Sequence, residues 1–361
     1  MATPLTQHEG KFLKAYSNFP VGQFVSLILV RKTESEVVFR TEGSGQELSK
    51  EFVRAGDQDG AIIQRVLMTK RKQIAVERRT GRELLRDNGL LYFAGGKASG
   101  DVSDMCGLNR NKPCGRCIDC YLYGYAVGKG GEDIGAQKSR VITDDSFSIL
   151  SVPVVTDKRT FNGIFENGTM RDPITGDPSR SLVPLDPYVK PETHFLEIET
   201  LKDVTLGEWV YVLGNVLRST RYGAVSSRQG RMKNVLAGVV FSNCEIFSNL
   251  ELTQRVYDLL KAQDAELNFP LRDADVLKAT AAATLALMAN VVSAEPLVLG
   301  LDEAARVRRA VVAVYRDAER VAALLRATEQ GYSTDRKAAE AAHVEVMRLL
   351  EAAGEAENDS E

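Results

Sequence analysis

Four of the five cysteines of this chain lie in one short stretch, with the spacing C-x7-C-x2-C-x2-C. They are Cys106, Cys114, Cys117 and Cys120. Thiolates two residues apart in a turn can bind the same ion, and zinc prefers four sulfur ligands arranged in a tetrahedron. The basic neighbours Arg110, Lys112 and Arg116 favour thiolate chemistry over inert burial. The spacing therefore predicts a structural zinc site, because four cysteine ligands leave no open position for catalysis.

Three other uses of these cysteines fit the spacing. Two local disulfides are one, but no signal peptide precedes the cysteines, so we expect a reducing compartment in which disulfides are disfavoured. An iron–sulfur cluster is the second, because spacing alone does not choose the metal. A redox enzyme that uses the C-x2-C pairs is the third, although nothing else in the sequence resembles a flavin or nicotinamide site. The histidines His8, His194 and His343 have no metal-like spacing, and we predict that the protein is not an enzyme.

Charge is unevenly distributed along the chain. Lysine and arginine number 46 and the acids 49, so the net charge of -3 does not by itself indicate a nucleic-acid partner. Residues 65–86, however, contain eight basic and two acidic side chains, and residues 218–233 contain five basic side chains and no acid. A basic middle and an acid-rich end predict an anion-binding body with a solvated terminus. No apolar run is long enough to span a bilayer, and we expect a soluble, cytoplasmic protein.

The first basic segment is expected to contain a helix that begins at Thr80. Residues 23–41 before it predict a β-hairpin, because two runs rich in Val, Leu and Ile flank the polar turn 33–36. The first half of the basic segment alternates like a strand, and from Thr80 onward the pattern suits a helix with Glu83 at the capping-box position. A helix that begins among arginines presents free backbone N–H groups and a positive dipole end, which suits a phosphate. An ordinary solvated basic face is the alternative.

The rest of the chain mixes strands and helices. Residues 95–135 are expected to form an insertion that holds the cysteines. Residues 156–191, rich in Gly, Pro, Asp and Arg with apolar anchors between them, predict a protruding arm. The elements expected after the arm are a strand over 193–201, a helix over 205–220, a strand over 236–246, helices over 251–353 and an acidic disordered tail over 354–361.

The second basic segment combines glycines with hydroxyl and arginine side chains. Its basic residues are Arg218, Arg221, Arg228, Arg231 and Lys233. Gly223 and Gly230 let backbone N–H groups approach phosphates closely, and arginine binds phosphate bidentately. Tyr222 offers a face on which a base could stack. These features predict a phosphate-binding loop, with an ordinary basic surface loop as the alternative.

The order of several short motifs resembles that of the RAMP superfamily of CRISPR proteins. The motifs are TGRELLR at 80–86, LYG at 122–124, PETHFLEIETL at 191–201 and GAVSSRQGR at 223–231. Glu192 departs from the pattern, because the superfamily has a glycine there. With its four-cysteine insertion and long helical C-terminus, the chain most resembles the backbone subunit of type I-D effector complexes, the Csc branch of the large filament-forming Cas family. The resemblance covers roughly residues 20–250.

The resemblance implies a fold, a function and partners. The fold would be α+β, with a modified ferredoxin-like (RRM-like) core over residues 20–250, the zinc-stapled insertion, a β-hairpin arm and a C-terminal helical region. Such subunits polymerise along CRISPR RNA without cleaving it and hold its backbone in a basic groove. A thumb-like arm flips out bases, so that the exposed guide segments pair with invading DNA. The partners would be the guide RNA, target DNA through the guide, further copies of the chain, and the large, 5′-end capping and RNA-processing subunits.

The resemblance also assigns residues to the groove. One side would carry Lys70, Arg71, Lys72, Arg78, Arg79 and Arg82. The other side would carry Arg218, Arg221, Tyr222, Arg228, Arg231 and Lys233, and Met170 or a neighbouring arm residue would be the wedge between bases. Two alternatives stay open. A type III-like subunit would cut target RNA with Asp157, Asp172 or Asp177, and a zinc-ribbon nucleic-acid-binding factor would be unrelated to CRISPR.

Overall fold

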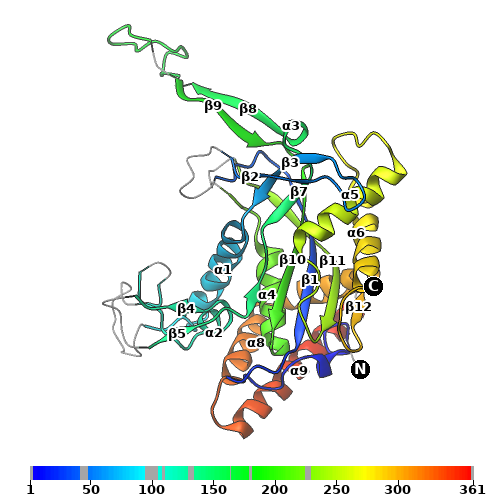
Figure 1. Cartoon of the computed structure of the whole chain (residues 1–361). Coiled ribbons are helices and arrows are strands. Elements are labelled where there is room, and N and C mark those ends of the chain that lie inside the picture. The colour runs from blue at the N-terminus through cyan, green and yellow to red at the C-terminus, as the bar shows by residue number, and fades with distance from the viewer. Residues whose placement is uncertain are drawn as a thin grey trace.

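A computed structural model of the chain describes residues 3–40, 48–93, 105–107, 110–128, 134–162, 164–178, 181–223 and 229–358. Within these residues, eight strands form one antiparallel sheet in the order β12-β11-β1-β10-β7-β3-β2, with β6 paired to β10. Helices pack on both faces of the sheet, and a two-stranded ribbon projects from one end of the molecule (Figure 1). The mixed α+β class expected from the sequence is confirmed.

The sheet is built around β1 (Phe24–Thr33). One edge of β1 pairs with β10 (His194–Lys202) and the other with β11 (Met232–Ser242). The run FVSLILV is buried throughout, as expected for a strand whose two faces are both covered. The remaining strands of the sheet are β2 (Lys50–Arg54), β3 (Ile62–Met68), β6 (Val141–Ile142), β7 (Ser146–Ser151) and β12 (Leu297–Leu299).

Two groups of helices cover the two faces of the sheet. The first group is α4 (Leu206–Arg218), α7 (Leu301–Tyr315), α8 (Ala318–Gln330) and α9 (Arg336–Asn358). It shares a hydrophobic core with Leu27 and Leu29 of β1. The second group is α5 (Asn249–Gln263) and α6 (Asp273–Met288), which pack on the other face against Ile28 and Val30. Successive side chains of a strand point to opposite faces, so β1 contributes to both cores.

The cysteine-rich insertion and the arm extend from this body. The insertion contains α2 (Ile118–Tyr123) and the small ribbon of β4 (Tyr125–Ala126) and β5 (Ala136–Gln137), and it packs beside α1 (Lys70–Asp87). The arm begins after the short helix α3 (Val152–Val155) and consists of β8 (Thr156–Asn162) paired antiparallel with β9 (Ser181–Val189). Figure 1 shows the arm pointing away from the sheet, on the same side of the molecule as α1 and the insertion.

The hairpin predicted over residues 23–41 is wrong. The first half is β1, but Val37 forms only an isolated bridge, with Val189 at the base of the arm. The reason is that β10 and β11 already pair with both edges of β1. The buried side chains of Val37 and Phe39 instead join a third core, under the arm.

The basic helix begins ten residues before the predicted start. Thr69 is the N-cap residue of α1, and Thr80 lies well inside the helix. The buried face of α1 is largely polar, since it carries Gln73, Glu77 and Gly81 beside Val76 and Leu85. A polar buried face hides the apolar periodicity by which an amphipathic helix is recognised, and this explains the error.

The C-terminal helices follow the predicted region and extend beyond it. α9 continues to Asn358, past the boundary expected after residue 353, because the segment EAAGEAEN is rich in Glu and Ala, which are strong helix formers. Residues 359–361 lie outside the described residues. Among the helices of the described chain, none combines the length and the apolar character needed to cross a membrane.

A candidate metal centre and a candidate nucleic-acid interface

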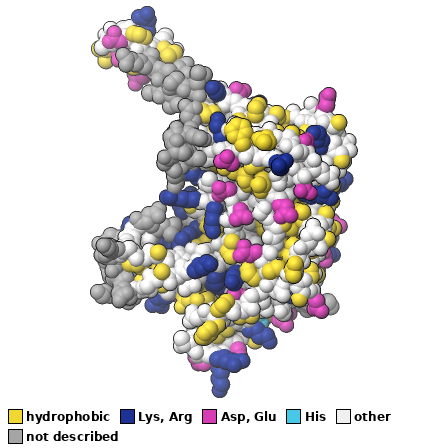
Figure 2. Space-filling view, viewed as in Figure 1, with side chains coloured by type: hydrophobic (Ala, Val, Ile, Leu, Met, Phe, Trp, Pro, Cys, Tyr) yellow, Lys and Arg dark blue, Asp and Glu magenta, His cyan; other side chains and the backbone are white. Residues whose placement is uncertain are grey.

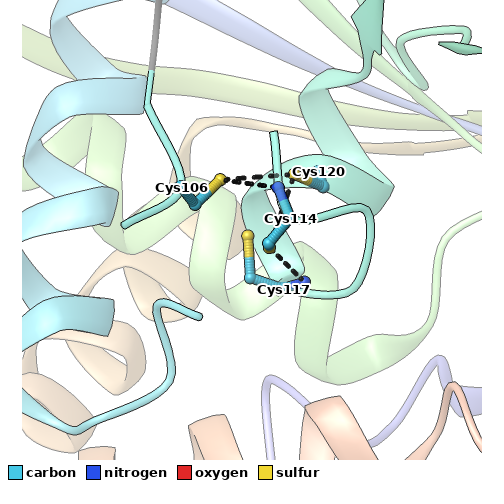
Figure 3. A group of neighbouring side chains, drawn as sticks. All are labelled: Cys106, Cys114, Cys117 and Cys120. Atoms are coloured by element: carbon cyan, nitrogen blue, oxygen red, sulfur yellow. Dashed lines mark hydrogen bonds between the residues drawn. The ribbon is translucent and has the colours of Figure 1, made fainter. Parts of the chain in front are cut away.

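The four clustered cysteines converge on one point. Cys117 is the N-cap residue of α2 and Cys120 lies in that helix, while Cys114 comes just before the turn at Gly115, where φ is +70°. Cys106 is held by a backbone hydrogen bond from its N–H to the carbonyl of Tyr92, of 2.7 Å. All four residues are buried, and their Sγ atoms all lie within 4.8 Å of one another (Figure 3).

The sulfur separations fit one tetrahedrally bound ion. Cys106 Sγ is 3.6 Å from Cys120 Sγ, and Cys114 Sγ is 3.8 Å from Cys120 Sγ. Four thiolates about 2.3 Å from a common ion lie about 3.8 Å apart. An iron–sulfur cluster distributes its four cysteines over two or four irons, which separates some of the sulfurs farther than a single ion does, and a disulfide needs sulfurs about 2.0 Å apart. Hydrogen bonds among the four thiols lower the pKa of Cys106 and raise the pKa of Cys117 and of Cys120.

Arg78 and Arg82 of α1 bind this insertion instead of facing solvent. The Arg78 guanidinium binds both carboxylate oxygens of Asp119, with distances of 2.8 and 3.0 Å. Arg82 donates to Asp119 Oδ2 at 2.6 Å and also to the backbone carbonyl of Cys106. Both guanidiniums predicted for the RNA groove are thus bound by the insertion, which leaves fewer of their N–H groups for a phosphate.

Other basic residues of α1 do face solvent. Lys70, Arg71 and Arg79 are exposed, and Lys72 is half-buried. Lys70 and its neighbours form the first turn of the helix, so the predicted helix start among basic residues exists, although not at Thr80. The backbone N–H of Lys70 donates to the carboxylate of Asp145 at 2.9 Å, which satisfies one of the free N–H groups expected at this end.

The second basic segment forms a loop between α4 and β11. Arg218 is exposed at the end of α4, and Lys233 is exposed on β11. Arg221 donates to the backbone carbonyl of Gln229 at 2.9 Å, and Arg231 forms an exposed ion pair with Glu34 at 3.0 Å. Arg228 lies outside the described residues.

The structure explains why glycine occupies two positions of this loop. Gly223 has a φ of +79°, and a Cβ there would lie 2.6 Å from the carbonyl oxygen of Val38. Gly230 has a φ of +87°, and a Cβ there would lie 2.6 Å from the carbonyl oxygen of Tyr222. Both positions require glycine because the loop packs closely on the protein itself. Their presence is therefore not evidence for a phosphate.

Tyr222 is fully buried, and its predicted role as a stacking platform does not hold. Its hydroxyl accepts hydrogen bonds from Arg31 at 2.9 Å and from Asn234 at 2.8 Å. It donates to the Glu77 carboxylate of α1 at 3.2 Å. Burial raises the pKa of Tyr222, so the hydroxyl stays protonated and can donate. The residue joins the loop to α1 from inside.

These bonds belong to a buried charge cluster that the sequence analysis missed. Arg31 of β1 pairs with Glu77 at 2.7 Å and with Glu197, and it lies 4.0 Å from Glu199. All four side chains are fully buried. Burial raises the pKa of Glu197 to about 7, and burial with the nearby Glu77 carboxylate raises that of Glu199 further. The sequence does contain a signal for this cluster, namely an arginine within the apolar run FVSLILVRK. A charged side chain on a buried strand is stable only when it is paired with opposite charges.

The contacts bring the basic helix and the basic loop side by side. Ser219 donates to the Thr80 hydroxyl at 3.1 Å, and Tyr222 binds Glu77 from the same helix. The exposed Arg79 of α1 lies between these two contact points in the sequence. Figure 2 shows a hollow on this face between the arm and the insertion, with Lys and Arg side chains gathered along it over α1.

The arm presents apolar side chains near its end. Met170 is 38% exposed, and Ile164 and Ile174 are more exposed still. The Asp172 carboxylate accepts hydrogen bonds from the N–H groups of Ile174 and Thr175, at 2.7 and 3.1 Å, and so shapes the turn in which it lies. The Asp157 carboxylate accepts a bond from the N–H of Lys158 at 2.8 Å.

Comparison with known proteins places these features in a family context. A protein-family model described as Csc2 Crispr matches residues 11–325. The crystal structure of Csc2 from Thermofilum pendens is similar over 92% of this chain and 91% of that one, with 17% identity and a TM-score of 0.57, which shows a common fold. A chain of a structure titled CRISPR RNA-guided surveillance complex aligns with a TM-score of 0.48 and 8% identity, over 80% of this chain and 99% of that one. A chain of a second structure, titled CRISPR RNA-guided surveillance complex, pre-nicking, aligns with a TM-score of 0.45 and 10% identity, over 76% of this chain and 90% of that one. No curated protein sequence matches.

Proposed function

The chain belongs to the Csc2 CRISPR family, and from this we propose that it is the non-catalytic, guide-RNA-binding backbone subunit of a type I-D CRISPR effector complex. The strand order β11-β1-β10-β7 supports a ferredoxin-like RAMP core. Numbered along the chain, these strands are the fourth, first, third and second, and α1 and α4 lie in the connections as that fold requires.

One observation carries the RNA-binding proposal: two basic segments far apart in the sequence contact one another, beside a hollow in which Lys and Arg side chains gather. Lys70, Arg71 and Arg79 are exposed on α1, and Arg231 and Lys233 are exposed on the loop and β11. These cations lie on secondary structure or on a loop that internal hydrogen bonds hold in place. Such an arrangement suits a sugar–phosphate backbone, which is bound through charge irrespective of base sequence.

The sheet face offers no competing site. RNA-binding domains with an RRM fold place aromatic residues on an open sheet face and stack bases there. Here α5 and α6 cover that face and pack against Ile28, Val30 and Ile198. We therefore assign the guide to the hollow beside α1.

The arm and the cysteines complete the proposal. The arm would act as the thumb that separates guide bases, with Met170 or a neighbouring arm residue as wedge, while the guide pairs with target DNA. Further copies of the chain would bind along the same RNA, together with the large, 5′-end capping and RNA-processing subunits, in the cytoplasm. The four cysteines would hold a structural zinc ion, since an all-sulfur, closed tetrahedral site is the one zinc favours.

Titration of single-stranded RNAs of increasing length and unrelated sequence tests the function. Gel shifts and electron microscopy should show stepwise coating in proportion to RNA length, and binding should weaken as salt rises. Arg79→Ala with Arg231→Ala should weaken binding to all sequences alike and make the salt dependence shallower. Arg272→Ala, at an exposed position before α6, is the matched control for loss of a cation. A single complex independent of RNA length would refute the backbone role, and cleavage of complementary RNA at regular intervals with a divalent metal would refute the non-catalytic one.

A further inference from the structure

We propose that Asp119 is a positioning residue through which metal loading of the cysteine cluster fixes the basic helix α1, so that metal binding and guide-RNA binding strengthen one another. The RNA half of this inference rests on the function proposed above. The metal half rests on the contacts between α1 and the insertion.

Asp119 lies between two of the cysteines, and its carboxylate accepts hydrogen bonds from two arginines of α1. It is fully buried, and both carboxylate oxygens are used, Oδ1 by Arg78 and Oδ2 by Arg78 and Arg82. Arg78 and Arg82 are four residues apart and therefore project from the same face of α1. One buried carboxylate thus holds two successive turns of the helix.

The same two arginines reach the cysteine segment on either side of Asp119. Arg82 donates to the Cys106 carbonyl, and its Nη1 lies 3.6 Å from Cys106 Sγ. Arg78 donates to the carbonyl of Gly124, just after α2, at 2.9 Å. Helix α1 is therefore joined to Cys106, to α2 through Asp119, and to the segment after α2 through Gly124.

Charge links these contacts to the metal. A divalent ion with four thiolates has a net charge of -2, and N–H groups that donate to the sulfurs stabilise it. Arg82 is such a donor, and Asp119 orients it. Loading the ion also fixes the cysteines relative to one another, and with them the Asp119 carboxylate and the Cys106 carbonyl that Arg82 binds, so it should hold α1 more firmly against the insertion. The exposed cations Lys70, Arg71 and Arg79 belong to the same helix, so fixing α1 also fixes the positions of these three side chains.

Coupling of this kind is reciprocal. If the metal raises the affinity for RNA by some factor, RNA must raise the affinity for the metal by the same factor, and coupled sites typically show about five- to 150-fold. A purely structural role for Asp119 would lower stability without this reciprocity. The two readings are therefore separable by experiment.

The test compares the full-length wild type with Asp119→Asn, and uses Glu83→Gln as the matched control. Both substitutions remove one negative charge, but Glu83 is exposed on the outer side of α1. Hydrogen exchange of the α1 amides is measured with zinc bound and after its removal by a chelator, with the β1 amides as the reference for global opening. The affinity for zinc is then measured by equilibrium competition with a chelating dye, with and without single-stranded RNA.

In the wild type and in Glu83→Gln, removing zinc should lower protection of α1 more than of β1, and RNA should raise the affinity for zinc by at least about fivefold. Asp119→Asn should bind zinc about ten- to a hundredfold more weakly, show reduced α1 protection even with zinc bound, and lose the effect of RNA on the affinity for zinc.

Equal α1 protection with and without zinc, or wild-type behaviour of Asp119→Asn, would overturn the proposal. If Asp119→Asn does not fold, Arg78→Lys carries the same test, because it keeps the charge and loses the two-pronged contact. If the wild type binds no RNA, the proposed function fails, and the exchange measurement still decides whether zinc fixes α1.

Discussion

Glu197 provides the sharpest test of the buried charge cluster. Burial raises its pKa from 4.5 to about 7, with the Arg31 guanidinium opposing the shift and the Glu77 carboxylate adding to it. Between these two pH values the folded protein keeps the proton of Glu197 while the unfolded chain has lost it. The folded state therefore binds more protons, and this stabilising contribution, complete below pH 4.5, is lost as pH rises through about 7.

The expected size follows from the interval between the two pKa values. Each pH unit in which one proton is bound only by the folded state changes the free energy of unfolding by about 1.4 kcal/mol. Across the interval from 4.5 to about 7, the loss is about 3 kcal/mol. Glu197→Gln removes the titration while keeping the shape of the side chain. The difference in free energy of unfolding between wild type and Glu197→Gln should therefore fall by about 3 kcal/mol from pH 4.5 to pH 8.

Urea unfolding at several pH values, followed by circular dichroism, measures this difference. Glu83→Gln, which alters an exposed carboxylate of α1, is the control for loss of one ionisable group. The wild-type curve alone is insufficient, because other groups titrate over the same range. A difference that stays constant from pH 4.5 to pH 8, or that grows, would refute the reasoning that Glu197 takes up a proton when it is buried.

Three further substitutions test the packing of α1, of the loop and of α4. Gly81→Ala should destabilise the fold by about 1–3 kcal/mol in thermal unfolding, because a Cβ at this position would lie 2.3 Å from the Tyr211 hydroxyl; a stabilised variant would mean that α1 and α4 are not packed this closely. Tyr222→Phe should cost about 1–3 kcal/mol in urea unfolding, since it removes one of the two donors to the buried Glu77 carboxylate and takes an acceptor from Arg31 and Asn234, and the affinity for RNA should not change. A loss of RNA affinity at full stability would restore the exposed role for this residue. Thr205→Ala should cost about 1 kcal/mol by removing the N-cap of α4, and an unchanged melting temperature would contradict that contact.

The sequence was sufficient to predict features whose residues all lie within one short segment. The cysteine spacing predicts a metal-binding group because the four thiols converge within a single turn-rich segment. The helix over 205–220 and the strand over 193–201 are also found, since one has apolar residues at helical spacing and the other alternates along the chain. The composition of residues 156–191 predicts the arm, which forms the ribbon of β8 and β9.

Long-range pairing is what the sequence did not reveal. Nothing in residues 23–41 indicates that both edges of β1 are paired by strands more than 150 residues away. The buried partners of Arg31 come from α1 and β10, so no short window contains the cluster. Tyr222 was misassigned for the same reason, because its burial depends on Val37, Phe39 and other residues distant in the sequence.

The basic segment shows why a count of charges overstates a binding surface. Arg65 donates to the backbone carbonyls of Ala55, Ser148 and Ile149 inside the fold, and Arg78 and Arg82 bind the cysteine insertion.

These three arginines are fixed on the interior or on the insertion side, and the outer face of α1 is left to residues such as Arg79 and Arg86. For single strands each phosphate neutralised contributes about 0.7 to the slope of log affinity against log salt. Removing Arg78 and Arg82 from the groove therefore lowers the expected slope by about 1.4 for each bound subunit. A measured salt slope that is explained only if Arg78 and Arg82 also contact phosphates would mean that α1 turns when RNA binds, and that the insertion releases the helix.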